Sequence, residues 1–426
     1  MYKVKKRNGF IAPYDLEKIS IAISGAFQDF DKEFEDIEVL NDIEDRLHQF
    51  FFNKDEYAPI EDIQDIVEDT LLDHGYREEA KAYIRYRYEH ELARQKELEK
   101  QVEDKLLAKQ IDNQNANIDE HSFGGRMGEA NSVVMKNYAL NHCMSKMARE
   151  NHLNNEIYIH DLDHYAVGDH NCLSIPFDKL LANGFNTRQT DVRPANSINT
   201  AFQLVAVIFQ LQSLMQFGGV AATHLDWTMV PYVRKSFYKH YVDGLNWLHP
   251  AKQVGENTFE KEDISWFWED PRNPEDISIE DSLYIRDKQV YSYAYEKTKQ
   301  ETHQAVEGMY HNLNTLQSRS GNQLPFTSIN YGTCTLPEGR MVTKALLEVS
   351  IEGLGKLHKT SIFPCGIFQC MKGVNRKPED PNYDLFRLAL KSTAQRLYPN
   401  YVNVDWSVNE GYDPDDPCTY TATMGL

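Results

Sequence analysis

Residues 158–185 read YIHDLDHYAVGDHNCLSIPFDKLLANGF, and this stretch decides which fold and which chemistry the chain can have. It places Cys172 among polar side chains, directly before an apolar segment. A thiol in such surroundings can act as a redox group, since its reactivity depends on exposure and nearby charge. Taken alone, Cys172 is better explained as a small buried hydrophobe, the role of most free cysteines. The motifs around it have to decide between the two.

The composition describes a large acidic protein. A chain of 426 residues is long enough for two or three domains of about 100–200 residues each. The formal net charge of −20 argues against nucleic acid as a partner, because nucleic-acid binding needs a basic face. The six cysteines are sparse and irregularly spaced, which argues against a disulfide scaffold and favours a reducing cytoplasm.

No segment of the sequence is typical of a secreted or membrane protein. The basic N-terminus is followed by Pro13 and Asp15 rather than by a long apolar run, so we expect no signal peptide. The longest apolar run, 201–222, is interrupted by several glutamines. A membrane span rarely holds so many amides, so we expect a buried helix there and no membrane partner.

Residues 1–92 are predicted to form a small, mostly helical domain. Asp15 is a candidate N-cap for a first helix, because apolar residues recur at helical spacing directly after it. A second helix is predicted between Pro59 and Gly75, and a third around Tyr83.

The rest of the chain has a different character. Residues 93–114 are rich in Glu, Lys and Gln and are predicted to be a helical connector. Residues 115–426 mix apolar helices with short β-like runs, such as 325–331 and 401–404, which favours an α/β domain with parallel strand pairing. The acidic, proline-containing segment 263–281 is predicted to be a surface insertion.

A basic cluster near the N-terminus is a candidate phosphate site. Lys5, Lys6 and Arg7 lie beside a predicted turn, and Lys18 lies in the first predicted helix. Arginine forks onto phosphate oxygens and lysine adds a point charge, so the cluster can hold a triphosphate. Taken alone, these residues are better explained as a solvated strand end. The chain has no Gly-x-x-x-x-Gly-Lys-Ser/Thr motif, so a P-loop ATPase is not supported.

The motifs of this region resemble those of the ATP-cone, a nucleotide-sensing module. They are KRNG at 6–9, DLEKI at 15–19, IQDIVE at 63–68 and AKAYIRYR at 80–87. The resemblance implies that ATP and dATP bind here as allosteric effectors. It gives phosphate-binding roles to Lys6, Arg7 and Lys18, and it has Val4 and Ile19 enclose the base. Lys81 is a further candidate effector ligand.

A second set of motifs covers most of residues 115–425. They are NANIDE at 115–120, YIHDLD at 158–163, NC at 171–172, LLANGF at 180–185, PANSINT at 194–200, FGG at 217–219, LYPN at 397–400 and ATMG at 422–425. In this order they resemble the anaerobic, class III ribonucleotide reductases, which are glycyl-radical enzymes. The resemblance implies a ten-stranded α/β barrel, of which residues 115–426 would form the N-terminal part.

The same resemblance implies an activity. The family is an oxidoreductase that reduces ribonucleoside triphosphates to deoxyribonucleotides for DNA replication, with a glycyl radical and, in much of the family, formate as reductant. A radical-SAM iron–sulfur activating enzyme and a second copy of the chain are the implied partners. Cys172 matches the cysteine that supplies reducing hydrogen, for which we expect a dry site. Asn171 is expected to bind a ribose hydroxyl of the substrate, because its amide adds no titrating charge.

Ser197 and Asn199 are two further candidates for substrate binding. They lie in the segment 194–200, which precedes the predicted apolar helix. Free N–H groups at a helix N-terminus favour anions, so this segment can hold a substrate phosphate. An ordinary N-cap explains the same residues equally well.

No metal site is predicted from the sequence of this chain. His160, Asp161 and Asp163 offer one histidine at useful spacing, so a turn before Cys172 explains them better. Cys365 and Cys370 are spaced more widely than zinc-binding pairs usually are. The four-cysteine zinc site of the resembled family belongs to its C-terminal region and has no counterpart here.

The sequence departs from the family pattern at its last residue. Leu426 follows Met424-Gly425, where the family has its radical cysteine. From this we expect a fragment or a truncated form that is inactive by itself. A catalytically incompetent ATP/dATP-sensing protein is the alternative. A glycyl-radical enzyme of the pyruvate formate-lyase type is disfavoured, because such enzymes have no need of an ATP-cone.

Overall fold

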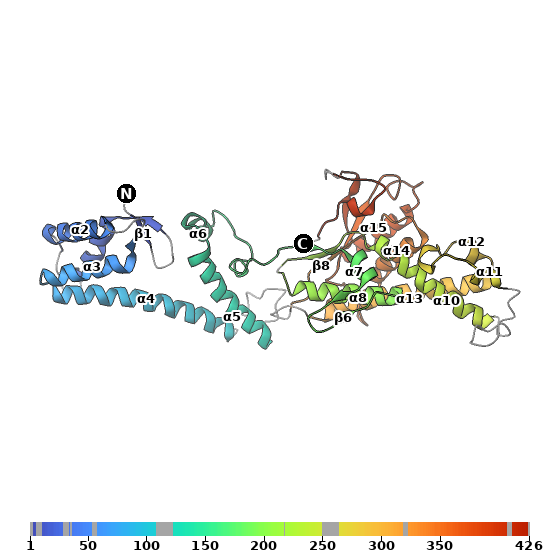
Figure 1. The fold of residues 1–426 in the computed structure, drawn as a ribbon, viewed down its shortest axis with the longest axis horizontal. Coiled ribbons are helices and arrows are strands. Elements are labelled where there is room, and N and C mark those ends of the chain that lie inside the picture. The colour runs from blue at the N-terminus through green and yellow to red at the C-terminus, as the bar shows by residue number, and fades with distance from the viewer. Residues whose placement is uncertain are drawn as a thin grey trace. The chain divides into compact units, whose positions relative to one another are not determined.

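The computed structural model describes residues 3–5, 11–28, 34, 36–52, 58–107, 122–216, 218–248, 264–317, 323–406 and 411–424. The chain divides into two compact units, Met1–Gly168 and Asp169–Leu426, which are treated separately below (Figure 1). Helices occur in both units, whereas the larger, parallel sheet belongs to the second.

The first unit begins with a small sheet and four helices. Strand β1 (Lys3–Lys5) pairs antiparallel with β2 (Ile11–Pro13) and parallel with β3 (Ala58–Pro59). The helices are α1 (Leu16–Gln28), α2 (Ile37–Phe52), α3 (Ile60–Asp73) and α4 (Arg77–Leu106). The Asp15 carboxylate accepts a hydrogen bond from Glu17 N at 3.1 Å, so the predicted start of α1 is confirmed.

Apolar side chains of these elements form one core. Its fully buried members include Ile23 of α1, Ile43 and Leu47 of α2, and Val67 and Leu71 of α3. They recur three or four residues apart, so each helix turns one apolar stripe inward. Helix α2 was absent from our prediction, although its Val39, Ile43 and Leu47 follow the same spacing.

Helix α4 is longer than predicted. It runs without interruption from the core of this unit into the segment expected to be a separate connector, and its buried residues Ala80, Ala82 and Tyr83 all lie near its start. Three helical elements follow: α5 (Phe123–Tyr138), the π-helix η2 (Ala139–Cys143) and α6 (Lys146–Leu153).

The second unit contains a five-stranded, all-parallel sheet in the order β10-β9-β8-β7-β4. The strands are β4 (Leu173–Ser174), β7 (Val220–Ala222), β8 (Thr327–Tyr331), β9 (Cys365–Cys370) and β10 (Asn400–Asn403). The α/β class is therefore confirmed, and the strands expected near 325–331 and 401–404 are present. Closure into a ten-stranded barrel stays a prediction.

Helices and short elements connect the strands. After β4 come α7 (Phe177–Asn183), the hairpin β5 (Phe185–Asn186) and β6 (Asp191–Val192), and α8 (Ile198–Ser213). After β7 come α9 (Leu225–Thr228), α10 (Val230–Leu248), α11 (Ser265–Trp268), η4 (Pro274–Asp276), α12 (Ser282–Ile285) and α13 (Lys288–Thr315). Helix α14 (Pro337–Glu352) follows β8, α15 (Tyr383–Arg396) follows β9, and η5 (Val404–Trp406) and η6 (Pro417–Thr419) follow β10.

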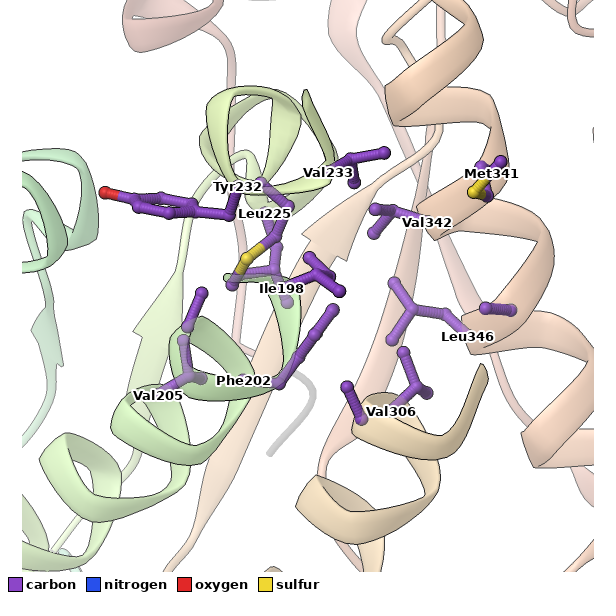
Figure 2. Packing of buried hydrophobic residues seen from close by; sticks show 14 of the residues in the cluster. Ile198, Phe202, Val205, Leu225, Tyr232, Val233, Val306, Met341, Val342 and Leu346 are labelled. Carbon is purple, nitrogen blue, oxygen red and sulfur yellow. The ribbon is translucent and has the colours of Figure 1, made fainter. Parts of the chain in front are cut away.

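The main core lies between one face of this sheet and the helices. Ile329, Tyr331 and Phe368 of the strands pack with residues of α8, α10, α13, α14 and α15. Figure 2 shows Phe202 of α8, Val306 of α13 and Leu346 of α14 pointing toward one another from neighbouring helices. Burial of this many apolar side chains, at roughly 1.5–3 kcal/mol each, is the main stabilising force of the unit.

Two predictions in this unit were wrong in part. The segment 201–222 is a buried helix only as far as Ser213, and its last residues form strand β7 instead. The segment 263–281 is no mere surface insertion, because Phe267, Ile277 and Ile279 are buried in the main core. The segment is acidic and contains prolines, and its three apolar anchors form no continuous helical period, so the sequence pattern did not reveal their burial.

None of the helices in the described part of the chain is long and apolar enough to cross a membrane.

Candidate functional site

The register of the parallel sheet gives it a second, polar face. One face of the sheet packs against the helices. It carries Val220 and Ile329, which belong to the main core, and also Leu173 and Thr327, which pair directly with Val220 in the neighbouring strands. Successive side chains along a strand alternate between the two faces. By the same alternation the opposite face carries Ser174, Ser328, Asn330 and Gln369, together with the apolar Ala221, Cys365 and Ile367, and Cys172 directly precedes β4 on this side. We call Cys172, Ser174, Ser328, Asn330 and Gln369 the polar face.

Cys172 lies at the edge of this face, at the start of β4. Its thiol lies 3.5 Å from the side-chain oxygen of Asn171, and the backbone N–H of Gly219 donates to its sulfur at 3.3 Å. The side chain is exposed, which removes the explanation as a buried hydrophobe. The dry surroundings that we expected for this thiol are likewise not found in this structure.

A close approach of two backbone segments fixes the position of Asn171 and Cys172. Leu173 N donates to Gly219 O at 3.1 Å, and a bridge joins His170 to Gln216. A Cβ atom at Gly218 would collide with the carbonyl oxygen of Asn171. Only glycine therefore fits at position 218 without displacing the segment that holds the thiol.

Amide side chains of the polar face bind a further stretch of backbone. Asn330 Nδ2 donates to Ala222 O at 2.9 Å and to Thr423 O at 3.0 Å, and its Oδ1 accepts from Thr423 N at 3.1 Å. Gln369 Nε2 donates to Thr223 O at 3.2 Å and to Thr421 O at 3.1 Å. The segment Thr421–Thr423 is thus held over the polar face by side chains rather than by strand pairing.

Ser197 is the N-cap of helix α8. Its hydroxyl accepts from Thr200 N at 3.2 Å, and the next N–H, of Ile198, donates to the buried Ser236 hydroxyl at 2.9 Å. Asn199 is exposed on the first turn. No hydrogen bond within the described part of the chain joins Ser197 or Asn199 to Asn171 or Cys172. The capping role is therefore present, and phosphate binding stays a prediction.

The predicted effector ligands lie in the first unit. Val4 is buried in its core and Ile19 packs against that core. The amino group of Lys18 lies 3.5 Å from the Asp15 carboxylate, and that of Lys81 lies 2.8 Å from the Glu78 carboxylate; both lysine side chains are more than half exposed. Lys6 and Arg7 fall outside the described residues.

A polar cluster that the sequence did not reveal lies past the carboxyl ends of β4 and β7. His224 Nε2 lies 2.7 Å from Asp178 Oδ2 and 3.9 Å from Cys418 Sγ, while its Nδ1 lies 2.7 Å from the Thr223 hydroxyl. Burial opposes charge on His224, but the hydrogen bond and charge of Asp178 outweigh it and raise the pKa of the imidazole. Burial likewise opposes charge on Asp178, yet the same contact lowers the pKa of that carboxyl.

The buried carboxyl of Asp226 has a structural role. Asp226 accepts hydrogen bonds from Gly332 N and Cys334 N at 2.9 Å each and from Trp227 N at 3.1 Å. Burial raises the pKa of Asp226, although the three N–H groups partly offset this. The carboxyl joins the start of α9 to the loop after β8.

The fold defines the class: an α/β protein with a parallel sheet, preceded by a small helical unit. The model of the anaerobic ribonucleoside-triphosphate reductase family matches residues 114–425, and that of the ATP cone domain matches residues 2–92. The chain therefore belongs to the anaerobic ribonucleoside-triphosphate reductase family and contains an ATP cone domain. The resemblance inferred from the sequence motifs is confirmed.

Several curated relatives share the family name. The anaerobic ribonucleoside-triphosphate reductase of Haemophilus influenzae is 29% identical over 411 residues, which are 95% of this chain and 52% of the relative. That of Escherichia coli is 28% identical over 407 residues, covering 94% of this chain and 51% of the relative. The chain thus spans about half the length of the curated relatives it matches.

Solved structures of the family are also matched. One is the anaerobic ribonucleotide reductase from Thermotoga maritima with dATP bound in the specificity site. It is 13% identical, with a TM-score of 0.44, and the match covers 72% of this chain and 48% of the other.

Proposed function

We propose that this chain takes part in the anaerobic reduction of ribonucleoside triphosphates to deoxyribonucleoside triphosphates, under control of ATP and dATP at the cone. The family match over residues 114–425 is the observation that carries the proposal. The position of Cys172 supports it, because the thiol lies on the polar face and beside the amide of Asn171.

In this proposal Cys172 supplies reducing hydrogen to the substrate, and Asn171 binds a ribose hydroxyl. A thiol S–H can give up a hydrogen atom, and the N–H of Gly219 orients the sulfur for this at 3.3 Å. Ser197 and Asn199 are the proposed phosphate contacts at the start of α8. The glycyl radical, formate and the radical-SAM activating enzyme belong to the same proposal, as does assembly into homodimers.

A substitution of the thiol tests the catalytic part. In the protein as it occurs in the cell, Cys172→Ser is expected to abolish deoxynucleotide formation and to leave ATP binding unchanged, because the hydroxyl cannot replace the thiol as a hydrogen donor. Cys143→Ser, in the other unit, is the matched control and should keep activity. Normal turnover of Cys172→Ser would remove this residue from the mechanism.

The regulatory part places ATP or dATP at the cone. Lys6, Arg7 and Lys18 are the proposed phosphate ligands, Lys81 is a further one, and Val4 and Ile19 are proposed to enclose the base. The exposed amino groups of Lys18 and Lys81 support this, since neither is sequestered in the core. Binding of an effector would act by its different affinity for two states of the enzyme.

Isothermal titration of ATP and dATP tests the cone directly. Lys18→Ala is expected to weaken binding, and Lys6→Ala combined with Arg7→Ala to weaken it further, since each removes positive charge from the phosphates. Lys297→Ala, on α13 in the second unit, is the control. Unchanged affinity in both cone variants would contradict the proposed ligands.

We also propose a cytoplasmic location. All six cysteines are free thiols, which suits a reducing compartment.

A further inference from the structure

Three side chains that commonly bind metals converge beyond the carboxyl ends of β4 and β7. Asp178 lies in the first turn of α7, His224 follows β7, and Cys418 lies in η6. One carboxylate oxygen, the Nε2 of the imidazole and the sulfur all lie within 4.8 Å of one another. The carboxyl ends of parallel strands are where α/β proteins commonly place ligands.

The contacts of His224 distinguish this cluster from a catalytic triad. In a triad, the acid and the nucleophile contact opposite nitrogens of the imidazole. Here the Asp178 oxygen at 2.7 Å and the Cys418 sulfur at 3.9 Å both approach Nε2. The carboxylate and the thiol therefore lie on the same side of the ring, where a cation that replaces the proton between His224 and Asp178 can reach all three donor atoms.

The groups around His224 are also suited to metal binding. The Thr223 hydroxyl lies 2.7 Å from Nδ1, where it can accept a proton and leave the Nε2 lone pair free. Such outer hydrogen bonds orient the histidines of metal sites. The Thr228 hydroxyl donates to the backbone oxygen of His224 at 3.2 Å, and the carboxylates of Asp226 and Asp416 add negative charge around the imidazole.

We propose that Asp178, His224 and Cys418 bind one zinc-type divalent transition metal ion, with water as a fourth ligand. Zinc accepts sulfur, nitrogen and oxygen donors together in tetrahedral sites. Magnesium and calcium select oxygen donors, so the thiol and imidazole exclude them as the preferred ion. Binding displaces the proton shared by His224 and Asp178 and the thiol proton of Cys418, and both are released to water.

The ion would tie the C-terminal segment to the sheet. Cys418 comes three residues before Thr421, whose carbonyl accepts from Gln369. A bond from the ion to Cys418 would therefore fix the start of the stretch that lies over the polar face. This site is separate from the expected four-cysteine zinc site of the family, and it does not depend on the proposed reductase activity.

Cobalt(II), a spectroscopic substitute for zinc, tests the site in the full 426-residue chain. After removal of metal, titration with cobalt should produce a thiolate-to-cobalt charge-transfer band that saturates near one ion per chain, and added zinc should abolish it. Cys418→Ser should lose the band, and Asp178→Asn should weaken it. Cys143→Ser is the matched control and should keep it.

Two further measurements separate loss of metal binding from loss of the fold. Because Cys418 and Asp178 are exposed, their substitution leaves the core intact, which circular dichroism can verify. Thr223→Val should weaken zinc affinity by about tenfold or more, since it removes the bond that orients the ring. The proposal is overturned if no band forms, if the band persists in Cys418→Ser, or if Cys143→Ser abolishes it as well.

Discussion

The two units of the chain place their polar interactions differently. In Met1–Gly168, Arg46 lies on the surface between Asp42 and Asp73, at 3.1 and 2.7 Å from their carboxylates. In Asp169–Leu426, the carboxylate of Asp226 and the amide of Asn330 are fully buried and bind backbone. In a helix, most backbone N–H and C=O groups form hydrogen bonds with each other. The loops above a parallel sheet have backbone N–H and C=O groups that need other partners.

The buried amides show how the second unit covers its polar face. Asn330 and Gln369 bind Thr421–Thr423 with the donors and acceptors that a neighbouring strand would otherwise supply. Among the described residues, the first unit buries few polar side chains, such as Thr70 and Glu79, whereas the second buries many. The following substitutions test that difference, starting with the largest expected effect.

Asp226→Ala should destabilise the second unit most. It leaves the N–H groups of Gly332, Cys334 and Trp227 buried without their acceptor, at a cost of about 3 kcal/mol in the free energy of unfolding. Urea unfolding measures it. Asp191→Ala, at an exposed carboxyl of the same unit, should stay within about 0.5 kcal/mol of the wild type. Equal effects for the two variants would contradict the structural role of Asp226.

Asn330→Ala should cost about 1–3 kcal/mol, because it removes three hydrogen bonds to buried backbone. Its more specific effect is local. The amide hydrogen of Thr423 should exchange with solvent faster, as seen by hydrogen-exchange mass spectrometry, while peptides of α13 keep their protection. Unchanged exchange at Thr423 would show that something other than this amide holds the segment.

Glu301 gives the second unit a pH-dependent contact between α10 and α13. Burial alone would raise the pKa of Glu301, but the hydrogen bond and charge of His240, 2.7 Å away, outweigh it, and the pKa is lowered from 4.5. A lowered carboxyl pKa stabilises the fold above the unfolded value, and this is lost as pH falls through the folded value.

Glu301→Gln should therefore lose about 1.5 kcal/mol at neutral pH and converge on the wild type in acid. Unfolding free energies measured from neutral pH down to below pH 4.5 decide this. A difference that is constant with pH would mean that packing, not charge, is what the substitution removes.

Arg46→Ala in the first unit should have the smallest effect. The pairs of Arg46 with Asp42 and Asp73 are about a third exposed on the arginine side, so solvent screens them. We expect a loss of no more than about 1 kcal/mol, and less in high salt. A loss as large as that of Asp226→Ala would erase the distinction between the two units.

Local patterns predicted much of the fold. Asp15 was recognisable as an N-cap because the apolar period starts directly after it, and β8 because 325–331 is a short β-like run. Helix α2 was overlooked although its pattern is regular. The anchors Phe267 and Ile279 could not be recognised, because their burial depends on helices distant in sequence.

For the sites too, local motifs were recognisable in the sequence and contacts between distant residues were not. Cys172 and Asn171 are neighbours in a motif, so sequence alone could single them out. The place of Cys172 on the polar face required the strand register. The Asp178, His224 and Cys418 cluster could not have been predicted, because its contacts join residues 46 and 194 positions apart. Only the fold brings these three together.

The close approach at Gly218 has a genetic consequence. A methyl group there would push against the backbone of Asn171, so any substitution would shift the thiol of the next residue, Cys172. In a saturation-mutagenesis library selected for growth, position 218 should tolerate no replacement, much like position 172 itself. Gly218 would then be constrained only because it positions the Cys172 thiol, although it has no side chain of its own to contribute.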